Sequence, residues 1–427
     1  MNYQLTFPQS LTGTIVLPAS KSISARALIM GALAGNCSLS NLSDCDDTRV
    51  LRKALGERLP EIDIMAAGTA MRFSTAYFAT CTGESHVITG TARMQQRPIQ
   101  VLVDALRQLG ADIEYVGNEG FPPLRITGKT LKGGEVELPA NVSSQYISAL
   151  LMIGPTLEKG LHLHLIGEVV SRPYIDMTLG LMKEFGAQAS WSSEQDIFVA
   201  PHPYTAGMDF CVEPDWSGAS YWYEAMALSP DAKARITLPA LRENSWQGDS
   251  AVCRLFRQLG VDTHFEKSVA ILTKNNSTEK PALFDVDFTA CPDLAQTFVV
   301  TCALMGQPFR FAGLQSLRIK ETDRIAALQH ELKKLGIDIQ SVSQNENGKR
   351  IEILEMLTPQ AVDKDIRQKT VEIATYEDHR MAMAFAPAAM IYPQLQIAHP
   401  EVVSKSYPTY WEDLLSIGAT IQDTEQP

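Results

Sequence analysis

The stretch from Arg318 to Arg324, Arg-Ile-Lys-Glu-Thr-Asp-Arg, gathers five ionisable side chains at one point of the chain. Apolar residues then recur at helical spacing from Ile325 to Leu335, which predicts an amphipathic helix that ends at Gly336. The start of a helix exposes unpaired N–H groups and a partial positive charge, so anions bind there readily. Cations beside carboxylates at such a start suit a site that holds phosphate or carboxylate and also transfers protons. For this stretch alone, a capped and solvated helix end is the competing interpretation.

Composition sets limits on the partners of such a site. A chain of 427 residues with 45% hydrophobic residues predicts a globular protein of two domains. No run of about 18 apolar residues appears, and the amino terminus lacks the basic and apolar segments of a signal peptide. The net charge of −12 argues against nucleic acid or an anionic membrane as a partner. Any anion-binding site therefore requires cations that are gathered locally.

The cysteines indicate a reducing compartment. There are seven of them, an odd number, and they are scattered with no Cys-x-x-Cys pair. This pattern favours reduced thiols in a cytoplasm over disulfides or a zinc site.

Two families of helices that alternate along the chain must position the charged residues. In the first family an amphipathic helix is closed by a glycine, at intervals of roughly 75 residues except for a shorter first one. The closing glycines are Gly56, Gly110, Gly186, Gly260, Gly336 and Gly418. The second family is more apolar, and its helices begin near residues 21, 68, 143, 215–220, 292 and 377. Stretches such as 161–166, 236–238 and 269–272 alternate as strands do. We therefore predict six copies of one unit of two helices and a few strands, with a shortened first copy that lacks a hairpin.

The joint order of several motifs resembles the enolpyruvyl transferases and, within that family, the EPSP synthases. The resemblance extends over essentially the whole chain. It is carried by residues 17–28, 67–72 (Ala-Gly-Thr-Ala-Met-Arg), 97–98, 143–145 (Ser-Ser-Gln), 171–176, 292–293, 320–324 (Lys-Glu-Thr-Asp-Arg), 378–383 (Asp-His-Arg-Met-Ala-Met) and 405.

The resemblance implies an α/β (α+β) fold, a two-lobed inside-out α/β barrel of six βαβαββ repeats with three in each lobe. One lobe is expected to comprise residues 1–18 and 214–427, and the other residues 19–213, with hinges near 17–19 and 213–215. Substrates of the family bind between the lobes.

The activity that the resemblance implies is transfer of the enolpyruvyl group of phosphoenolpyruvate to the 5-hydroxyl of shikimate 3-phosphate. Phosphate is released through a tetrahedral intermediate, in the pathway to chorismate and the aromatic amino acids. Charge neutralisation and proton transfer carry this reaction, so no metal or organic cofactor is expected. The resemblance also implies a cytoplasmic monomer.

Matching positions imply the substrate contacts. Those expected for phosphoenolpyruvate are Lys21, Gly68, Arg97, Gln145, Arg324, Arg380 and Lys405. Those expected for shikimate 3-phosphate are Ser22, Arg26, Ser143, Ser144, Gln145, Ser171, Tyr174, Asp293, Ser316 and Lys320. An arginine suits a carboxylate because its planar fork makes two parallel hydrogen bonds. Gly68 is expected to let phosphoenolpyruvate approach the backbone at a helix start.

Four residues are implied as catalytic. Asp293 is expected to accept the hydroxyl proton, and Glu321 to donate a proton to the methylene carbon of phosphoenolpyruvate. Lys21 is a second proton donor, and His379 either moves a proton or orients Glu321. Surrounding cations lower the pKa of a carboxyl group, so the order of steps between Asp293 and Glu321 stays open.

Four positions depart from the family pattern. Ala25 and Ala66 stand where the family usually has Asn, Phe73 replaces a Pro, and Ser316 replaces an Asn. Because these changes leave the charged positions intact, we expect activity. We also expect an unusual response to glyphosate, which resembles phosphoenolpyruvate.

Two alternatives remain. A UDP-N-acetylglucosamine enolpyruvyl transferase typically carries a reactive Cys in the loop before the Arg-Pro pair, and residues 91–96 contain none. A non-catalytic protein that binds phosphorylated metabolites would gain nothing from the extra negative charge of Asp293 and Glu321.

Overall fold

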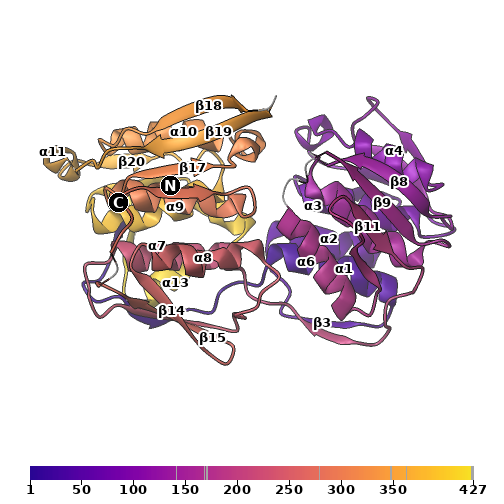
Figure 1. Cartoon of the computed structure of the whole chain (residues 1–427), viewed down its shortest axis with the longest axis horizontal. Helices are drawn as coiled ribbons and strands as arrows, with labels where there is room; N and C mark the ends of the chain where they lie inside the picture. The colour runs from indigo at the N-terminus through magenta and orange to yellow at the C-terminus, as the bar shows by residue number, and fades with distance from the viewer. Residues whose placement is uncertain are drawn as a thin grey trace. The chain divides into compact units, whose positions relative to one another are not determined.

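The computed structural model describes residues 1–140, 142–167, 169, 172–277, 279–346, 349–361 and 363–424. The chain forms two compact units. Unit 1 consists of Met1–Pro18 and Pro214–Pro427, and unit 2 of Ala19–Glu213. The amino-terminal and carboxy-terminal segments therefore belong to the same unit (Figure 1).

Unit 2 is built around three inner helices that contact one another pairwise. They are α1 (Lys21–Ala34), α3 (Gly68–Ala79) and α5 (Ser144–Ile153). These helices are apolar around most of their circumference, and such helices are stable only when surrounded by other elements. The outer helices carry a polar face, and they are α2 (Asp46–Glu57), α4 (Gln100–Gln108) and α6 (Arg172–Glu184). Two short 3-10 turns are η1 (Met94–Gln96) and η2 (Gly154–Thr156).

The strands of unit 2 form two four-stranded sheets and one two-stranded sheet. The first sheet has the order β4 (Glu61–Asp63), β5 (Ser85–Thr89), β7 (Leu124–Thr127), β6 (Asp112–Tyr115). The second has the order β10 (Ala189–Trp191), β11 (Asp196–Val199), β9 (Leu161–Ile166), β8 (Gly134–Pro139). The third pairs β12 (Asp209–Cys211) with β3 (Ser38–Ser40) in parallel. Because this sheet has no antiparallel hairpin among the described residues, the prediction of a shortened first repeat is confirmed.

Unit 1 repeats the plan. Its inner helices are α7 (Trp216–Leu228), α9 (Ala295–Leu304) and α12 (His379–Phe385), which also contact one another pairwise. The other helices are α8 (Val252–Arg257), α10 (Arg324–Lys334), α11 (Lys364–Arg367) and α13 (Tyr410–Ser416). Short 3-10 turns are η3 (Gly248–Ala251), η4 (Pro292–Leu294), η5 (Gln315–Ile319), η6 (Ala386–Met390) and η7 (Pro400–Lys405). Figure 1 shows α7 and α9 between the β14–β15 hairpin and the β18–β19 hairpin.

Three four-stranded sheets surround these helices. The first has the order β14 (Val261–Glu266), β15 (Val269–Lys274), β13 (Arg235–Pro239), β2 (Thr12–Thr14). The second has the order β16 (Phe284–Asp287), β17 (Phe309–Ala312), β19 (Lys349–Met356), β18 (Gln340–Glu346). The third has the order β20 (Val371–Ile373), β21 (Leu395–Ala398), β1 (Asn2–Thr6), β22 (Thr420–Asp423). Each combines one parallel pair with antiparallel neighbours. The predicted α/β class with three repeats in each unit is confirmed.

The glycines that close the first helix family have the predicted left-handed conformation in five of six cases. Their φ angles are 103° at Gly110, 84° at Gly186, 89° at Gly260, 79° at Gly336 and 90° at Gly418. The prediction for Gly56 was wrong. There α2 continues to Glu57, and Arg58 takes the left-handed conformation with φ 46°. The helix therefore ends two residues later than the glycine indicated.

Among the helices in the described part of the chain, none has the length and apolar character needed to cross a bilayer.

Candidate active site

Asp293 is the centre of a charged cluster in unit 1. It lies in η4, directly before α9, and its side chain is 17% exposed. Its carboxylate is 2.9 Å from Arg380 Nη2, 3.5 Å from Arg324 Nη1 and 3.7 Å from Lys320 Nζ. Opposite charges at such distances stabilise the charged form of a carboxyl group. The folded chain therefore brings a predicted proton acceptor into contact with three predicted substrate-binding cations.

Glu321 lies in the same cluster. Its carboxylate accepts hydrogen bonds from Arg324 Nη2 at 2.8 Å and pairs with Lys405 Nζ at 2.9 Å. Burial acts to raise the pKa of Glu321, but the charges of Arg324, Lys405 and His379 outweigh it and hold that pKa well below its usual range. Glu321 is therefore an ionised carboxylate in these surroundings and cannot donate a proton unless its pKa rises.

Arg324 connects the two carboxylates and is itself held from behind by Asp378. Its side chain is only 2% exposed, and its Nε donates to Asp378 Oδ2 at 2.7 Å. The carboxylate of Asp378 also accepts the N–H of Arg380 at 2.8 Å and so caps α12. One buried acid thus holds the side chain of Arg324 and caps the helix that begins beside Arg380. Our sequence interpretation gave Asp378 no role, although its place beside His379 and Arg380 in the motif was a signal.

The remaining predicted residues of unit 1 lie on nearby turns and helix starts. His379 is the first residue of α12 and is buried, Lys405 ends η7, and Ser316 lies half-buried in η5. Arg318 is the first cation of the charged stretch 318–324, but it lies outside the cluster. Its guanidinium pairs with Asp323 and Glu352, both at 2.9 Å.

In unit 2, Arg26 is a buried cation without a countercharge. It is 3% exposed, and no carboxylate among the described residues pairs with it. Its donors reach only neutral groups, which are Thr178 Oγ1 at 2.8 Å, Ser22 O at 2.9 Å, Ser148 Oγ at 3.0 Å and Tyr174 O at 3.3 Å. Burial lowers the pKa of Arg26 to about 10. A buried charge that lacks an opposite charge is costly, and an anionic ligand would reduce this cost.

Gly68 and Arg97 form a second cationic position in unit 2. A Cβ atom at Gly68 would lie 2.5 Å from Arg97 Nη1 and 2.9 Å from Arg97 Cζ. The guanidinium of Arg97 therefore rests on the first residue of α3. We expected Gly68 to make room for a ligand, and in this structure it makes room for an arginine. Arg97 is exposed and forms no ion pair within the described residues.

The start of α5 lies beside the start of α3. Ser143 caps α5 by accepting the N–H of Gln145, and Gln145 Nε2 donates to Thr69 Oγ1 at 3.2 Å. Ser144 is the first residue of α5. The polar groups of two helix starts are thus adjacent, an arrangement that suits an anion.

Four other residues that we predicted for the site belong to unit 2, and the structure describes three of them. Lys21 begins α1 and pairs with Asp47 at 3.7 Å, an acid to which we had given no role. Ser22 and Tyr174 accept hydrogen bonds from Arg26 through their main-chain carbonyls, and both are half-buried. Ser171 lies outside the described residues.

The positions that depart from the family pattern differ in how deeply they are buried. Phe73 is fully buried in α3, with its ring centroid 5.5 Å from the guanidinium carbon of Arg26. Ala25 is also buried, whereas Ala66 is exposed before the start of α3. Phe73 therefore affects the cation that is expected to bind shikimate 3-phosphate.

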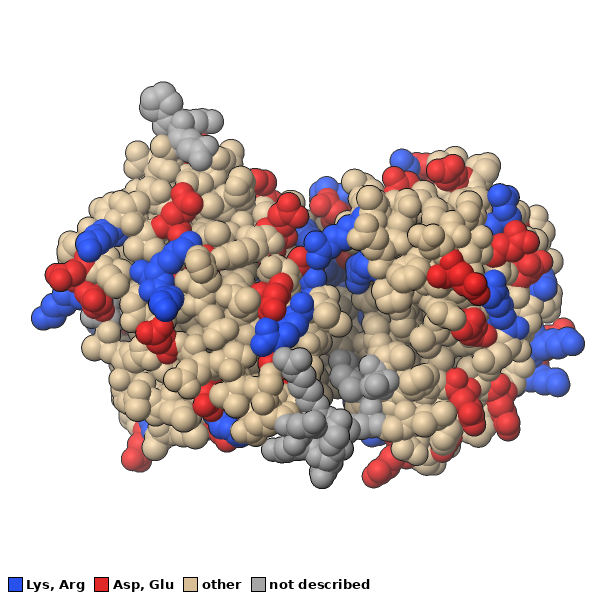
Figure 2. All heavy atoms as spheres, turned by 90° about the horizontal axis from the view of Figure 1, so that it is seen from above, with Lys and Arg blue, Asp and Glu red and all other residues tan. Residues whose placement is uncertain are grey.

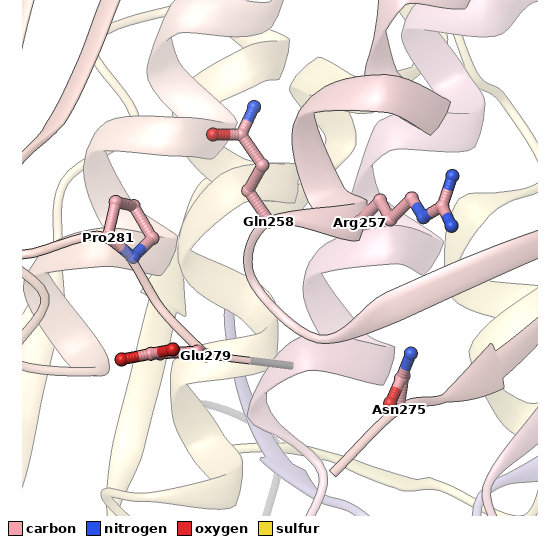
Figure 3. A pocket seen from close by; sticks show the side chains of 5 residues that line it. All are labelled: Arg257, Gln258, Asn275, Glu279 and Pro281. Atoms are coloured by element: carbon pink, nitrogen blue, oxygen red, sulfur yellow. The ribbon is translucent and has the colours of Figure 1, made fainter. Parts of the chain in front are cut away.

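The rest of the described surface offers weaker sites. On the face in Figure 2, blue Lys and Arg side chains are interspersed with red Asp and Glu. An open pocket of about 380 Å³ is lined by Arg257, Gln258, Asn275, Glu279 and Pro281 (Figure 3). It contains none of the predicted residues. No cluster of His, Cys, Asp and Glu within the described residues is arranged to hold a metal ion.

Comparisons with known proteins agree with this picture. The family model of EPSP synthase (3-phosphoshikimate 1-carboxyvinyltransferase) matches residues 5–59 and 57–414. A 3-phosphoshikimate 1-carboxyvinyltransferase of Bacteroides fragilis is 57% identical, with 100% of both chains covered. One of Vibrio atlanticus is 35% identical over 95% of this chain and 97% of the relative. A solved EPSP synthase of Acinetobacter baumannii matches the fold with a TM-score of 0.77 and 21% identity, covering 99% of this chain and 100% of the other.

Proposed function

Because this chain belongs to the EPSP synthase family, we propose that it transfers the enolpyruvyl group of phosphoenolpyruvate to the 5-hydroxyl of shikimate 3-phosphate, with release of phosphate. The observation that carries the proposal beyond family membership is the cluster in unit 1. Two carboxylates, Asp293 and Glu321, share contacts with Arg324 and are surrounded by further cations. Simple anion binding gains nothing from carboxylates among the cations, whereas a carboxylate can accept or donate the protons that this reaction moves.

Asp293 suits the deprotonation step. The attacking hydroxyl must lose a proton as the carbon–oxygen bond forms, and an ionised carboxylate held in place by three cations can accept that proton. The same cations stabilise the negative charge that the substrates bring. Lys320, which pairs with Asp293, is assigned to shikimate 3-phosphate.

Glu321 can act as the acid only after its surroundings change. Its pKa is held low by Arg324 and Lys405, both of which we assign to phosphoenolpyruvate. A bound phosphate or carboxylate would share these two cations and so raise the pKa of Glu321 toward the range in which it carries a proton. The proton then goes to the methylene carbon, which becomes a methyl group in the tetrahedral adduct. As the bond to phosphate breaks, this methyl group returns a proton to Glu321, so that phosphate leaves and the enolpyruvyl double bond is restored. In this scheme the binding of phosphoenolpyruvate raises the pKa of Glu321, the acid that then protonates it.

In unit 2 we assign the binding of anionic groups to the three cations. Arg26, which is buried and has no countercharge among the described residues, is assigned to shikimate 3-phosphate together with the polar residues at the start of α5. Arg97 and Lys21 are assigned to phosphoenolpyruvate. Arg97 is exposed, so no ion pair with another described residue has to break when an anion arrives.

The test is phosphate release on mixing the protein with phosphoenolpyruvate and shikimate 3-phosphate. We expect turnover in the parent protein and a loss of at least about a hundredfold in Asp293→Asn and Glu321→Gln, because each removes one proton-transfer group. Asp285→Asn is the matched control, since Asp285 lies on strand β16 and pairs with Arg310 at the surface. Full activity in Asp293→Asn would refute the assigned base.

The same assay separates the alternatives. Turnover with UDP-N-acetylglucosamine in place of shikimate 3-phosphate would indicate the other branch of the family. Tight binding of shikimate 3-phosphate without turnover would indicate a non-catalytic binding protein. An ordinary glyphosate inhibition constant, measured beside family members with the usual residues at positions 66 and 73, would contradict the expected unusual response.

We further propose that the protein works as a monomer in the cytoplasm. The reduced-thiol pattern of the sequence supports the compartment. Each unit has its own hydrophobic core, which agrees with a chain that needs no second copy to fold. Sedimentation of the purified protein tests the monomer directly.

A further inference from the structure

A carboxyl group that the proposed mechanism does not use is buried close to the cluster in unit 1. Asp249 lies in η3 and is 6% exposed. Its one hydrogen-bond partner among the described residues is the hydroxyl of Ser217, which donates to Asp249 Oδ2. No cation in that part of the chain forms an ion pair with it.

The start of α7 connects Asp249 to the catalytic cluster. Gln247, two residues before Asp249, accepts the N–H of Trp216 at 3.2 Å and donates to the carbonyl of Pro214 at 2.8 Å. These bonds and the Ser217 contact fix η3 to the first turn of α7. One turn later, Tyr221 Oη accepts a hydrogen bond from Arg380 Nη1 at 3.4 Å. The same helix segment therefore holds Asp249 and contacts the arginine that binds Asp293.

The charges that face Asp249 come from three elements, which are η4, α7 and α12. Burial, followed by the charge of Asp293, raises the pKa of Asp249 to about 7, and Asp215 at the start of α7 adds to this effect. Arg380 on α12 and the Ser217 hydroxyl act in the opposite direction.

The other titratable neighbours contribute little. Burial raises the pKa of Cys291, just before η4, to about 12, so its thiol is neutral at physiological pH. Arg254 on the adjoining helix α8 is exposed. Arg380 is thus the cation that most favours the ionised form of Asp249.

We infer that the binding of an anion at Arg380 is accompanied by proton uptake on Asp249. The inference rests on the proposed function, which assigns Arg380 to phosphoenolpyruvate. An anion that shares the charge of Arg380 weakens the interaction that keeps Asp249 ionised, so the acid takes a proton from the solvent. Once protonated, Asp249 donates its hydrogen bond to Ser217 Oγ instead of accepting one. Asp249 therefore takes no direct part in the reaction, and its protonation limits the change in charge of the site when the substrate binds.

The test is calorimetric titration of the full-length protein with phosphoenolpyruvate in several buffers of different ionisation enthalpy at one pH. The slope of observed heat against buffer enthalpy gives the number of protons taken up. At pH 7 we expect the parent protein to take up as much as about half a proton more than Asp249→Asn, because a pKa near 7 leaves Asp249 half protonated beforehand. The ligand's own protonation cancels in this difference.

Glu224→Gln is the matched control. Glu224 is another buried acid on α7, and burial raises its pKa well above the usual value, so it is already protonated before ligand binds. Its replacement should leave proton uptake as in the parent protein. Equal uptake in the parent and Asp249→Asn would overturn the inference and leave the proposed function intact. A parent protein that does not bind phosphoenolpyruvate alone would overturn the inference as stated, whereas the absence of phosphate release with both substrates would refute the proposed function itself.

The parent protein alone provides a second measurement if Asp249→Asn does not fold. Proton uptake in excess of the ligand's own titration should rise above pH 6, reach a maximum above pH 7 and decline at higher pH. A profile that the titration of phosphoenolpyruvate explains completely would overturn the inference.

Discussion

Glu224 in the core of unit 1 leads to a prediction about stability and pH. Both carboxylate oxygens are buried and have no hydrogen-bond partner of ordinary geometry among the described residues. The hydroxyl of Thr301 would favour the ionised form, but it donates to the Thr297 carbonyl at 2.7 Å. Burial therefore raises the pKa of Glu224 well above its usual value. The folded protein keeps this residue as a neutral acid.

The consequence for stability has a definite sign. In the unfolded chain Glu224 titrates with an ordinary pKa of about 4.3. Above that pH the unfolded state loses the proton while the folded state retains it, so rising pH favours unfolding. The cost is about 1.4 kcal/mol for each pH unit between the unfolded-state and folded-state pKa values of this group. The contribution is absent below the unfolded-state pKa and complete above the folded-state one.

Glu224→Gln removes the titration and keeps the shape. The free energy of unfolding of the variant, minus that of the parent, should increase by about 1.4 kcal/mol per pH unit from pH 5 upward. A fixed offset from the buried amide does not change this slope. Urea unfolding followed by tryptophan fluorescence suits the measurement, because four of the five tryptophans lie in unit 1, the unit that contains Glu224. The fifth, Trp191, lies in unit 2.

Glu331→Gln is the contrasting variant. Glu331 is also buried, but its carboxylate pairs with Lys334 at 2.7 Å and accepts the Tyr376 hydroxyl at 2.6 Å. Its replacement should destabilise the protein at neutral pH, because a charged partner is lost. If the difference between Glu224→Gln and the parent does not change from pH 5 to pH 8, the argument for a buried neutral acid is wrong.

Three further predictions concern the site. Asp378→Asn should lower the free energy of unfolding by about 3 kcal/mol in urea titrations, since it weakens the buried pair with Arg324. A loss below about 1 kcal/mol would show that the other acids in contact with Arg324 suffice to stabilise its buried charge. Gly68→Ala should raise KM for phosphoenolpyruvate by about tenfold, because the methyl group displaces Arg97, and an unchanged KM would exclude Arg97 from the binding site. Shikimate 3-phosphate should raise the Tm of the parent protein but not of Arg26→Met, and an equal shift in both would refute the assignment of Arg26.

Much of the fold could be predicted because it depends on local patterns. The inner helices begin at or near the expected residues, with α1 at Lys21 and α3 at Gly68, because apolar runs and polar caps mark them in the sequence. Five closing glycines were placed correctly because a left-handed residue after a helix strongly favours glycine. At Gly56 the same rule failed, since Arg58 accepts that conformation and the helix continues past the glycine.

Local sequence patterns predicted less about the charged cluster in unit 1. Charge-bearing residues could be selected by their motifs, but their partners could not. Asp249 received no role because it lies in none of the motifs, and Asp378 received none because its place in a motif does not reveal which side chains it contacts. What distinguishes them is burial and the neighbours that distant segments supply.

The sequence by itself thus determined the repeat, the helix starts and the set of cations and carboxylates available for anion binding and proton transfer. The tertiary structure decided which of these groups meet. Asp293, directly before α9, contacts Arg324 and Arg380, which follow it by 31 and 87 residues, because α9 packs against both α10 and α12. It also decided which acids are ionised, since Glu321 lies among cations and Glu224 among apolar side chains. The physical reason is that protonation depends on burial and on charges within a few ångströms, and both arise from contacts between residues far apart in the chain.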